Sequence, residues 1–281
     1  MSAPPAFILR TFELSDQEFG LFQKFFFEQI GIALSNQKKI LLLGRFNRRL
    51  NELGLNSFRE YYDIISAPEN HVERQHAVDL ITTNETYFFR EDQHFKLLQD
   101  AIVADKRKTA PTGSPLRVWS AACSTGEEPY SIAMSLHHAM GGTDGWEITA
   151  SDISTRVLAS AQRGLFPLER VRGMPPEFLK KYCLRGQGEF NGHLLIEKFL
   201  RDRVNFMQVN LMALPSELRN FDVVFLRNVI IYFDAATKLK VLRSVVNTLR
   251  PNGWLLLGHS ESLFGMDLPL RLIAPSVYRR I

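Results

Sequence analysis

The most informative segment of the chain is LRVWSAACSTGEEPY, which spans residues 116–130. Its first six residues, Leu116–Ala121, are mainly apolar and predict a buried strand. Small residues follow, and Ser131–Met140 then has the pattern of a helix. A strand, a turn of small residues and a helix start can bring backbone N–H groups close to a ligand. Because Gly126 is its single glycine, the segment lacks the GxGxxG pattern of dinucleotide-binding turns, and an ordinary strand-to-helix connection fits it as well.

The alternation of strands and helices continues downstream of this segment. Apolar runs bounded by turn residues predict further strands, and helical stretches separate them. This alternation is typical of a parallel α/β sheet. The predicted strands after the first are Glu147–Ser151, Val204–Val209, Phe221–Leu226 and Trp254–Gly258.

One connection in this region is unusually long. Residues 165–203 separate the predicted helix Thr155–Gly164 from the next predicted strand. The glycine-rich centre of the connection, Arg185–His193, lies between strand-like pieces. We therefore expect an inserted β-hairpin or small β-subdomain at about residues 166–203.

Upstream of the predicted sheet the sequence pattern is helical. From Asp16 to Ile81, apolar residues recur at three- and four-residue spacing, as at Phe22, Phe25 and Phe26, which predicts a small helical bundle. Residues 106–115, KRKTAPTGSP, have the composition of a linker or long loop.

Length and composition limit the class of protein. The chain of 281 residues exceeds an average domain, and we expect a small all-helical domain at residues 1–84 and an α/β domain at residues 85–281. Hydrophobic residues make up 45% and charged residues 23%, which excludes a disordered or fibrous chain. Since no apolar run reaches the length of a membrane span, we expect a soluble, cytoplasmic protein without membrane insertion. A monomer is the default expectation.

Cysteine usage and charge give weaker indications. Cys123 and Cys183 lie in dissimilar contexts without CxxC or Cys/His spacing, which argues against a disulfide framework or a structural zinc site, and we expect no metal. The net charge of +4 permits an acidic protein partner or nucleic acid without requiring either.

An acidic residue follows the second predicted strand. Asp152 lies at its carboxyl end, beside the end of Leu116–Ala121, where a carboxylate can accept hydrogen bonds from ribose hydroxyls. Asp152 could equally cap the following helix. The two strand ends together favour a cofactor that contains a nucleoside.

Four segments of the sequence carry a more specific signal: NETYFFR at Asn84–Arg90, WSAACSTGEEPYSIA at Trp119–Ala133, ASDI at Ala150–Ile153 and RNVIIYF at Arg227–Phe233. In content and order they resemble the motifs of CheR, the family of chemotaxis receptor glutamate methyltransferases. The likeness covers nearly the whole chain. One departure is Cys123, where relatives commonly carry a small residue such as alanine, and cysteine is small enough to preserve activity.

The resemblance implies a fold and a reaction. The fold would be a doubly wound, Rossmann-like class I methyltransferase domain with an inserted β-subdomain, preceded by the small helical domain. The cofactor would be S-adenosylmethionine and its product S-adenosylhomocysteine. The chain would be a protein-glutamate O-methyltransferase that forms γ-carboxyl methyl esters in the cytoplasmic part of chemoreceptors during chemotactic adaptation.

Carried over motif by motif, the resemblance also implies site residues. Asp152 would hold the ribose and Glu128 would lie in the first-strand loop, with Glu127 as the alternative for that carboxylate. Both acids could instead serve the helix dipole. Asn210 and Leu211 would flank the adenine, and Asn228 and Val229 would lie beside the methionyl portion. The other residues of the implied cofactor site are Asn84, Thr86, Arg90, Glu128 and Asp152.

Methyl transfer to a carboxylate needs positioning groups more than a general base, because a glutamate is already ionised at neutral pH. Arg90 and Tyr232 are the predicted catalytic residues. The guanidinium of Arg90 can orient a carboxylate, and Tyr232 can place a hydroxyl or ring near the sulfonium. Alternatively, Arg90 forms a salt bridge that closes the two domains, and Tyr232 is a core aromatic residue.

A basic segment in the helical half predicts the substrate surface. Residues 29–51 contain no acidic residue, and Leu43, Phe46 and Leu50 can face the bundle. We expect the basic face to bind the acidic helical bundle of a chemoreceptor, although a solvated face is the simpler interpretation. Nucleic acid is not expected, because no aromatic stacking platform accompanies the charge. The predicted substrate-binding residues are Lys38, Arg45, Arg48 and Arg49.

Two further alternatives stay open. The β insertion could dock a tether peptide from a receptor's C-terminus by strand addition, or it could simply cover a sheet edge. A nucleic acid methyltransferase is a rival activity, although Asn228–Tyr232 differs from the Asp/Asn-Pro-Pro-Tyr pattern of base amino-group methylation. A regulatory module without chemistry is a second rival, which the presence of Arg90 and Tyr232 disfavours.

Overall fold

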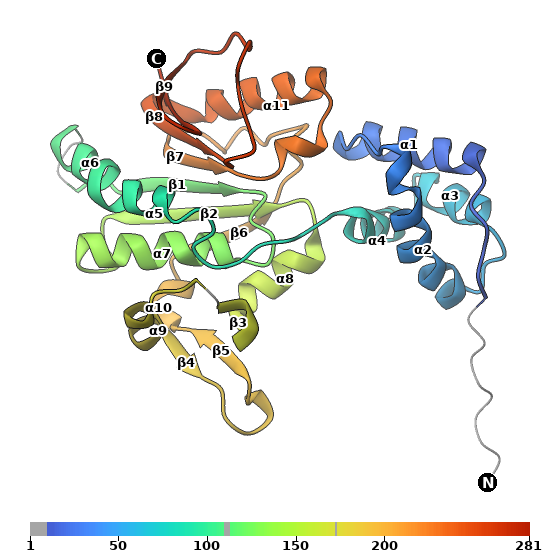
Figure 1. Ribbon diagram of the computed structural model, residues 1–281, viewed down its shortest axis with the longest axis horizontal. Coiled ribbons are helices and arrows are strands. Elements are labelled where there is room, and N and C mark those ends of the chain that lie inside the picture. The colour runs from blue at the N-terminus through green and yellow to red at the C-terminus, as the bar shows by residue number, and fades with distance from the viewer. Residues whose placement is uncertain (1–9, 110–112, 172) are drawn as a thin grey trace. The chain divides into compact units, whose positions relative to one another are not determined.

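The computed structural model describes residues 10–109, 113–171 and 173–281 (Figure 1). The chain divides into two compact units. The helical unit consists of the described residues up to Thr83 together with Tyr232–Asp234. The sheet unit consists of Asn84–Ile231 and Ala235–Ile281.

The helical unit contains four α-helices and a short 3-10 helix in its described residues: α1 (Asp16–Ile30), η1 (Asn36–Lys38), α2 (Lys39–Leu53), α3 (Phe58–Ser66) and α4 (His71–Ile81). Helix α1 begins at a capping box, in which the Ser15 side chain and the Glu18 carboxylate each bind the other residue's backbone N–H. It ends at Gly31, whose φ of 75° is the left-handed conformation that glycine adopts without strain. The predicted helical bundle is therefore confirmed.

Aromatic side chains fill the core of the helical unit. Phe22 contacts Phe46, with ring centroids 5.8 Å apart. Phe46 and Leu50 are buried on α2 as predicted. Leu43 is only half-buried, and the third buried residue of α2 is Leu42, which was not among the residues predicted to face the bundle.

The larger sheet of the sheet unit is mixed. Parallel pairing joins β6 to β2, β2 to β1, β1 to β7 and β7 to β8, whereas β10 is antiparallel to both β8 and β9. The strand order is therefore β6-β2-β1-β7-β8-β10-β9. The strands are β1 (Leu116–Ala121), β2 (Trp146–Asp152), β6 (Val204–Gln208), β7 (Phe221–Leu226), β8 (Leu249–Leu257), β9 (Leu270–Ala274) and β10 (Val277–Arg280).

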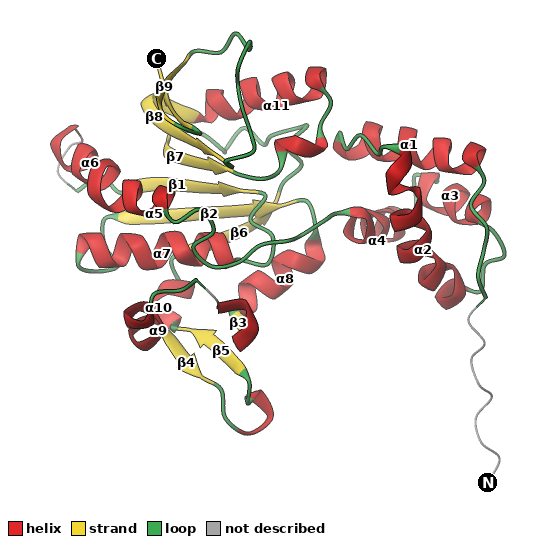
Figure 2. Ribbon diagram, in the orientation of Figure 1, coloured by secondary structure: helices red, strands yellow, loops and turns green. Residues whose placement is uncertain are grey.

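Helices flank this sheet (Figure 2). Helix α7 buries Ile132 and Leu136 in the same core as Val118, Val223 and Phe225 of the strands. The α/β fold with a preceding helical domain is thus confirmed. The helices of the sheet unit are α5 (Gln93–Leu97), the π-helical η2 (Leu98–Ile102), α6 (Val103–Thr109), α7 (Glu127–Met140), α8 (Thr155–Arg163), η3 (Leu168–Val171), α9 (Pro176–Tyr182), η4 (Gly188–Phe190), α10 (Lys198–Arg201) and α11 (Ala235–Thr248). The short helix η5 (Ile230–Tyr232) begins in the sheet unit, and its last residue, Tyr232, is counted with the helical unit.

The structure corrects the predicted loop at residues 106–115. Residues up to Thr109 belong to α6, and residues 110–112 lie outside the described part. Lys106 donates to both carboxylate oxygens of the buried Asp222, at 3.1 and 3.0 Å. Lys106, the first residue of the basic run, therefore compensates a buried acid together with Arg250, because a carboxylate in an apolar environment requires a charged partner.

The insertion forms a small antiparallel sheet of β3 (Leu165–Pro167), β4 (Cys183–Arg185) and β5 (His193–Ile196), with β5 in the centre (Figure 1). A small β-subdomain is thus confirmed, with three strands where a hairpin would have two. In the described residues, no helix combines the length and apolar character that crossing a membrane requires.

Candidate functional site

The parallel strands place their carboxyl ends at one edge of the sheet, and we call this the cofactor edge. The loop after β1 enters it with Ala122 and Ser124 at φ values of 62° and 51°. The carboxylate of Asp152, at the end of β2, accepts the Ser124 N–H at 2.9 Å and the Ser154 N–H at 2.9 Å. Asp152 therefore joins two loops at the cofactor edge.

Gly126 lets the start of α7 approach α8. Its φ is 101°, which other residues rarely adopt, and a Cβ atom there would lie 2.9 Å from the Cβ of Ala161. The close approach thus explains the single glycine of the first-strand loop. The structure also corrects the predicted start of this helix, because α7 begins at Glu127 and not at Ser131.

The two acids that begin α7 point to different neighbours. Glu128 accepts hydrogen bonds from the Ser120 hydroxyl at 2.7 Å and from Arg227 at 2.9 Å. Glu127 is fully buried, accepts the Thr125 hydroxyl at 2.6 Å and pairs with Arg170 at 3.1 Å. Specific partners thus hold both side chains, so their role is more than a general interaction with the helix dipole.

Arg227, directly after β7, connects three segments at the cofactor edge. Its side chain is 2% exposed and donates to Glu128, to Glu91 at 2.9 Å and to the backbone carbonyl of Arg90. Burial alone would raise the pKa of the Glu91 carboxyl, but the Arg227 guanidinium outweighs burial and lowers it. Sequence reasoning missed Glu91 and the role of Arg227. Their positions were the available signal, because Glu91 directly follows Arg90 and Arg227 directly precedes Asn228, and both of these neighbours were predicted site residues.

The segment with Asn84, Thr86 and Arg90 is held against the same loops. The Asn84 carbonyl accepts the Ser124 hydroxyl at 3.1 Å, and the Phe89 N–H donates to Ser131 at 3.0 Å. The Arg90 guanidinium donates to the Glu85 carbonyl at 3.1 Å, lies over the Tyr87 ring at 5.8 Å and is only partly buried. Thr86 is partly buried. The structure thus brings the first motif to the cofactor edge.

The loops after β7 and β8 share one buried carboxylate. Glu261, which is 4% exposed, accepts backbone N–H groups of Asn228 at 2.7 Å, Val229 at 2.9 Å, Ile230 at 2.9 Å and Gly258 at 2.7 Å. Burial raises the pKa of Glu261, and the four N–H donors oppose that rise. Sequence reasoning also missed this residue, and no motif identified from the residues contained it.

Asn210 and Leu211 follow β6 at the other end of the row of parallel strands. The Val209 N–H donates to the Asp152 carbonyl at 3.0 Å, and the Asn210 side chain accepts the Met212 N–H at 2.9 Å. Asn210 is half-buried and Leu211 is 9% exposed. All predicted cofactor residues thus lie in the sheet unit. They end or follow strands β1, β2, β6 and β7, whose carboxyl ends form the cofactor edge, or they belong to residues 84–90, which are hydrogen-bonded to the loop after β1 and to α7.

Tyr232, in contrast, groups with the helical unit. Its backbone carbonyl accepts the Ala33 N–H at 3.0 Å, and the next residue, Phe233, forms an antiparallel bridge with Ile32. The predicted catalytic pair of Arg90 and Tyr232 is therefore divided between the two units.

The four predicted substrate-binding residues differ in exposure and partners. Lys38 is exposed, and Arg48 is 84% exposed and pairs with Glu52. Arg45 donates to three carbonyls at the end of α4: those of Leu80, Ile81 and Thr82. Arg49 binds Glu73 at 2.5 Å and Glu52 at 3.1 Å.

Cys123 lies in the first-strand loop and is 1% exposed. Burial raises the pKa of its thiol well above the usual value, so the thiol stays protonated and unreactive. Cys123 therefore contributes a small buried side chain to the loop and no nucleophile.

The arrangement suits a cofactor that contains a nucleoside and an amino acid. A carboxylate at the end of β2 can accept ribose hydroxyls, and the partly buried guanidinium of Arg90 can bind a carboxylate. The donors and acceptors of this edge thus fit S-adenosylmethionine.

Comparisons with known proteins agree with this chemistry. The sequence profile described as "CheR methyltransferase, SAM binding domain" matches residues 84–278, and that described as "CheR methyltransferase, all-alpha domain" matches residues 17–82. A "Chemotaxis protein methyltransferase" of Escherichia coli K12 is 38% identical over 94% of this chain and 91% of its own length. "Chemotaxis protein methyltransferase 2" of Pseudomonas aeruginosa PAO1 is 40% identical over 98% of this chain and 96% of its own length. A "Chemotaxis protein methyltransferase" of Salmonella typhimurium LT2 is 39% identical over 94% and 90%, respectively.

Proposed function

This chain belongs to the CheR family of S-adenosylmethionine-dependent methyltransferases, and from that we propose that it esterifies glutamate side chains in the cytoplasmic part of chemoreceptors. The observation that supports this most is the assembly of the motif residues at the cofactor edge. The two acids assigned there, Glu128 and Asp152, already accept hydrogen bonds from other groups of the protein. A glutamate substrate that is ionised at neutral pH needs no general base. The reaction would adjust receptor signalling during chemotactic adaptation, in the cytoplasm.

We assign the cofactor to the residues at the strand ends. The Asp152 carboxylate would accept the ribose hydroxyls, Asn210 and Leu211 would flank the adenine, and Asn228 and Val229 would lie beside the methionyl portion. The geometry supports Glu128 over Glu127 as the loop carboxylate, because Glu128 is bound to Ser120 of β1 and to Arg227, whereas Glu127 is turned toward Arg170. Asn84, Thr86 and Arg90 would complete the site.

The protein's contribution to the reaction would be positioning. The bound cofactor supplies an electrophilic methyl group on a sulfonium. The Arg90 guanidinium would orient a carboxylate by paired N–H donors, and its contact with the Glu85 carbonyl limits its rotamers. Tyr232 would place its ring or hydroxyl near the sulfonium, and the Ala33 N–H binds the backbone carbonyl of Tyr232. Alignment of nucleophile and methyl group then provides most of the acceleration.

The receptor would contact the basic segment of the helical unit. Lys38 and Arg48 are the most available of the predicted residues, since both are exposed. Arg45 and Arg49 would act mainly by holding α2 against α4, because Arg45 donates to carbonyls at the end of α4 and Arg49 pairs with Glu73 of that helix. An acidic helical bundle is the partner that this charge favours.

A receptor tether peptide is a second proposed partner. In the β-subdomain both β3 and β4 are edge strands, and Leu184 on β4 is 49% exposed. A peptide could therefore add as a strand beside β4.

The test is incubation of the chain with methyl-labelled S-adenosylmethionine and a soluble cytoplasmic fragment of a receptor, followed by mild alkali. We expect label to enter the fragment and to leave it as volatile methanol, as carboxyl methyl esters do. Alkali-stable label would contradict glutamate esterification. Absence of label with a panel of receptor fragments, despite measured cofactor binding, would contradict the proposed substrate and leave the cofactor assignment intact.

A further inference from the structure

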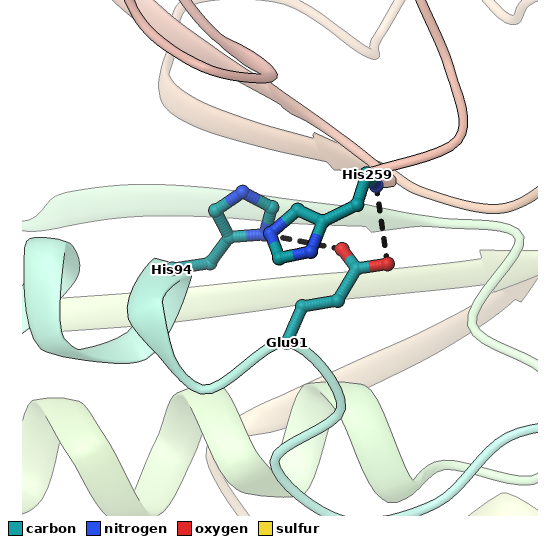
Figure 3. Close-up of side chains that lie close together, drawn as sticks. All are labelled: Glu91, His94 and His259. Carbon is teal, nitrogen blue, oxygen red and sulfur yellow. Dashed lines mark hydrogen bonds and ion pairs between the residues drawn. The ribbon is translucent and has the colours of Figure 1, made fainter.

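Three side chains of the sheet unit converge outside the assigned cofactor residues (Figure 3). Glu91 lies in the turn before α5, His94 is on α5, and His259 follows β8. One ligand atom from each lies within 4.8 Å of the others. We propose that Glu91, His94 and His259 form a binding site for a divalent transition metal, Zn²⁺ in the first instance.

The state of His94 is an independent reason to expect a ligand. Its side chain is 2% exposed, and in the described part of the chain neither ring nitrogen has a hydrogen-bond partner. Its Nδ1 lies 3.6 Å from the Glu91 carboxylate, which exceeds hydrogen-bond length. An unsatisfied buried imidazole nitrogen destabilises a fold, and a metal ion would provide the absent partner.

The ligand set selects the class of metal. Two imidazoles and one carboxylate are ligands that Zn²⁺ accepts in open, three-ligand sites, whereas Mg²⁺ and Ca²⁺ prefer oxygen alone. Burial lowers the pKa of His94 to about 4, so its ring carries a free lone pair at neutral pH. His259 is exposed and supplies the route by which an ion enters.

Hydrogen bonds already orient the carboxylate in this cluster. The backbone N–H of His259 donates to one oxygen of Glu91 at 3.1 Å, and Arg227 donates to the other at 2.9 Å. Such outer contacts fix the direction of metal ligands in known sites. Each carboxylate oxygen keeps a second lone pair that could bind the ion.

The charge of Arg227 weakens the site without excluding a cation. Arg227 pairs with both Glu91 and Glu128, so this group has one positive and two negative charges before a metal binds. A divalent ion changes the sum from −1 to +1. We therefore expect weaker binding than at a structural zinc site with several thiolates.

The test is titration of the tag-free, chelator-treated full chain with Zn²⁺ against a chromophoric chelator, with metal content measured by mass spectrometry. We expect one ion per chain and visible absorption from four-coordinate Co²⁺ in its place. H259A should reduce affinity by at least about tenfold. H71A, which removes an exposed histidine of the helical unit, is the matched control and should bind like the wild type.

A second variant keeps the test decisive if H259A alters the loop. H94L preserves most of the buried volume and removes both ring nitrogens, so it should lose the Co²⁺ spectrum while thermal unfolding still shows a folded chain. Equal Zn²⁺ affinity in wild type, H94L and H259A would show adventitious binding and overturn the site. Absence of binding by the wild type would overturn it as well. Neither outcome depends on the proposed methylation.

Discussion

One arginine in each unit pairs with two carboxylates, but the two differ in what they connect. Arg49 of the helical unit links α2 to α4 through Glu73, and its side chain is 22% exposed. Arg227 of the sheet unit is 2% exposed and links Glu128 to Glu91, together with the backbone of Arg90. The first arginine joins regular helices whose backbones are already hydrogen-bonded. The second fixes loops for which side chains provide much of the order.

This difference separates stability from cofactor binding. Removing Arg49 should loosen helix packing and leave the cofactor edge unchanged, whereas removing Arg227 should affect both the fold and the edge. Substitutions of the two arginines test this contrast. Glu261, a buried carboxylate that binds backbone N–H groups at the cofactor edge, offers a second test in the sheet unit.

The largest effect is expected for R227M, which leaves the partly buried carboxylates of Glu91 and Glu128 without their common partner. We expect a loss of about 3–5 kcal/mol in the free energy of unfolding, measured in urea. Calorimetry should show at least a tenfold weaker affinity for S-adenosylmethionine. R227M combined with E91Q and E128Q is the matched control and should regain part of the stability, since it carries no unpaired buried charge. Equal stability of R227M and wild type would refute the role of Arg227.

E261Q should have the next largest effect. Glutamine retains one acceptor oxygen where Glu261 uses two for four N–H groups. Because hydrogen bonds to a charged acceptor contribute about 1.5–3 kcal/mol, we expect a loss of about 2–3 kcal/mol. The KM for S-adenosylmethionine should rise more than kcat falls. S262A, next to it on an exposed position, is the control. A fall in stability with an unchanged KM would show a purely structural role.

R49M should cost about 2 kcal/mol in the helical unit, less than R227M because its carboxylate partners are more exposed. Hydrogen exchange of the α2 and α4 amides should accelerate, while the affinity for S-adenosylmethionine stays constant. Weaker cofactor binding in R49M would break the contrast between the two arginines.

The ion pair of Arg49 and Glu73 predicts that the free energy of unfolding depends on pH. Burial would raise the pKa of Glu73, but Arg49 and Tyr61 outweigh it and the pKa is lowered. A lowered pKa means that the pair stabilises the fold above the unfolded glutamate value of about 4.3 and that this contribution disappears as pH falls through the folded value. The stability difference between wild type and R49M should therefore narrow below about pH 4. A constant difference would contradict the ionised pair.

The sequence predictions succeeded for features with a local signal and failed for side chains whose partners lie far away in the chain. Residues 116–121 and 221–226 were predicted as strands with the observed bounds, because continuous apolar runs between turns are local signals. Arg227 and Glu261 escaped prediction because their partners lie far away in the chain: Arg227 and Glu91 are 136 residues apart and Glu261 and Asn228 are 33. Lys106 was assigned to a loop for the same reason, since its partner Asp222 is 116 residues away. Composition cannot show such pairs.

R90A tests the catalytic proposal at the cofactor edge with little effect on the fold, because the Arg90 side chain is partly exposed and contacts the nearby Glu85 carbonyl and Tyr87 ring. The backbone carbonyl that accepts from Arg227 is retained in alanine. We expect methyl transfer to fall about tenfold or more, about 1.4 kcal/mol in transition-state stabilisation, with unchanged circular dichroism. R90K keeps the charge but loses the paired donors, so it should restore only part of the activity. Wild-type turnover in R90A would remove Arg90 from the catalytic residues.

The smallest effect is expected for R48A on the basic segment. Arg48 is 84% exposed and pairs with Glu52 across one helix turn, so stability should change by less than about 0.5 kcal/mol. If this face binds an acidic receptor, the KM for the receptor fragment should still rise a few fold, and the difference should shrink at high salt. K24A on α1 removes the same kind of exposed pair, Lys24 with Glu28, from outside residues 29–51. Equal KM values for R48A and K24A would mean that the segment is a solvated surface, whereas an increase confined to R48A would assign it to the receptor.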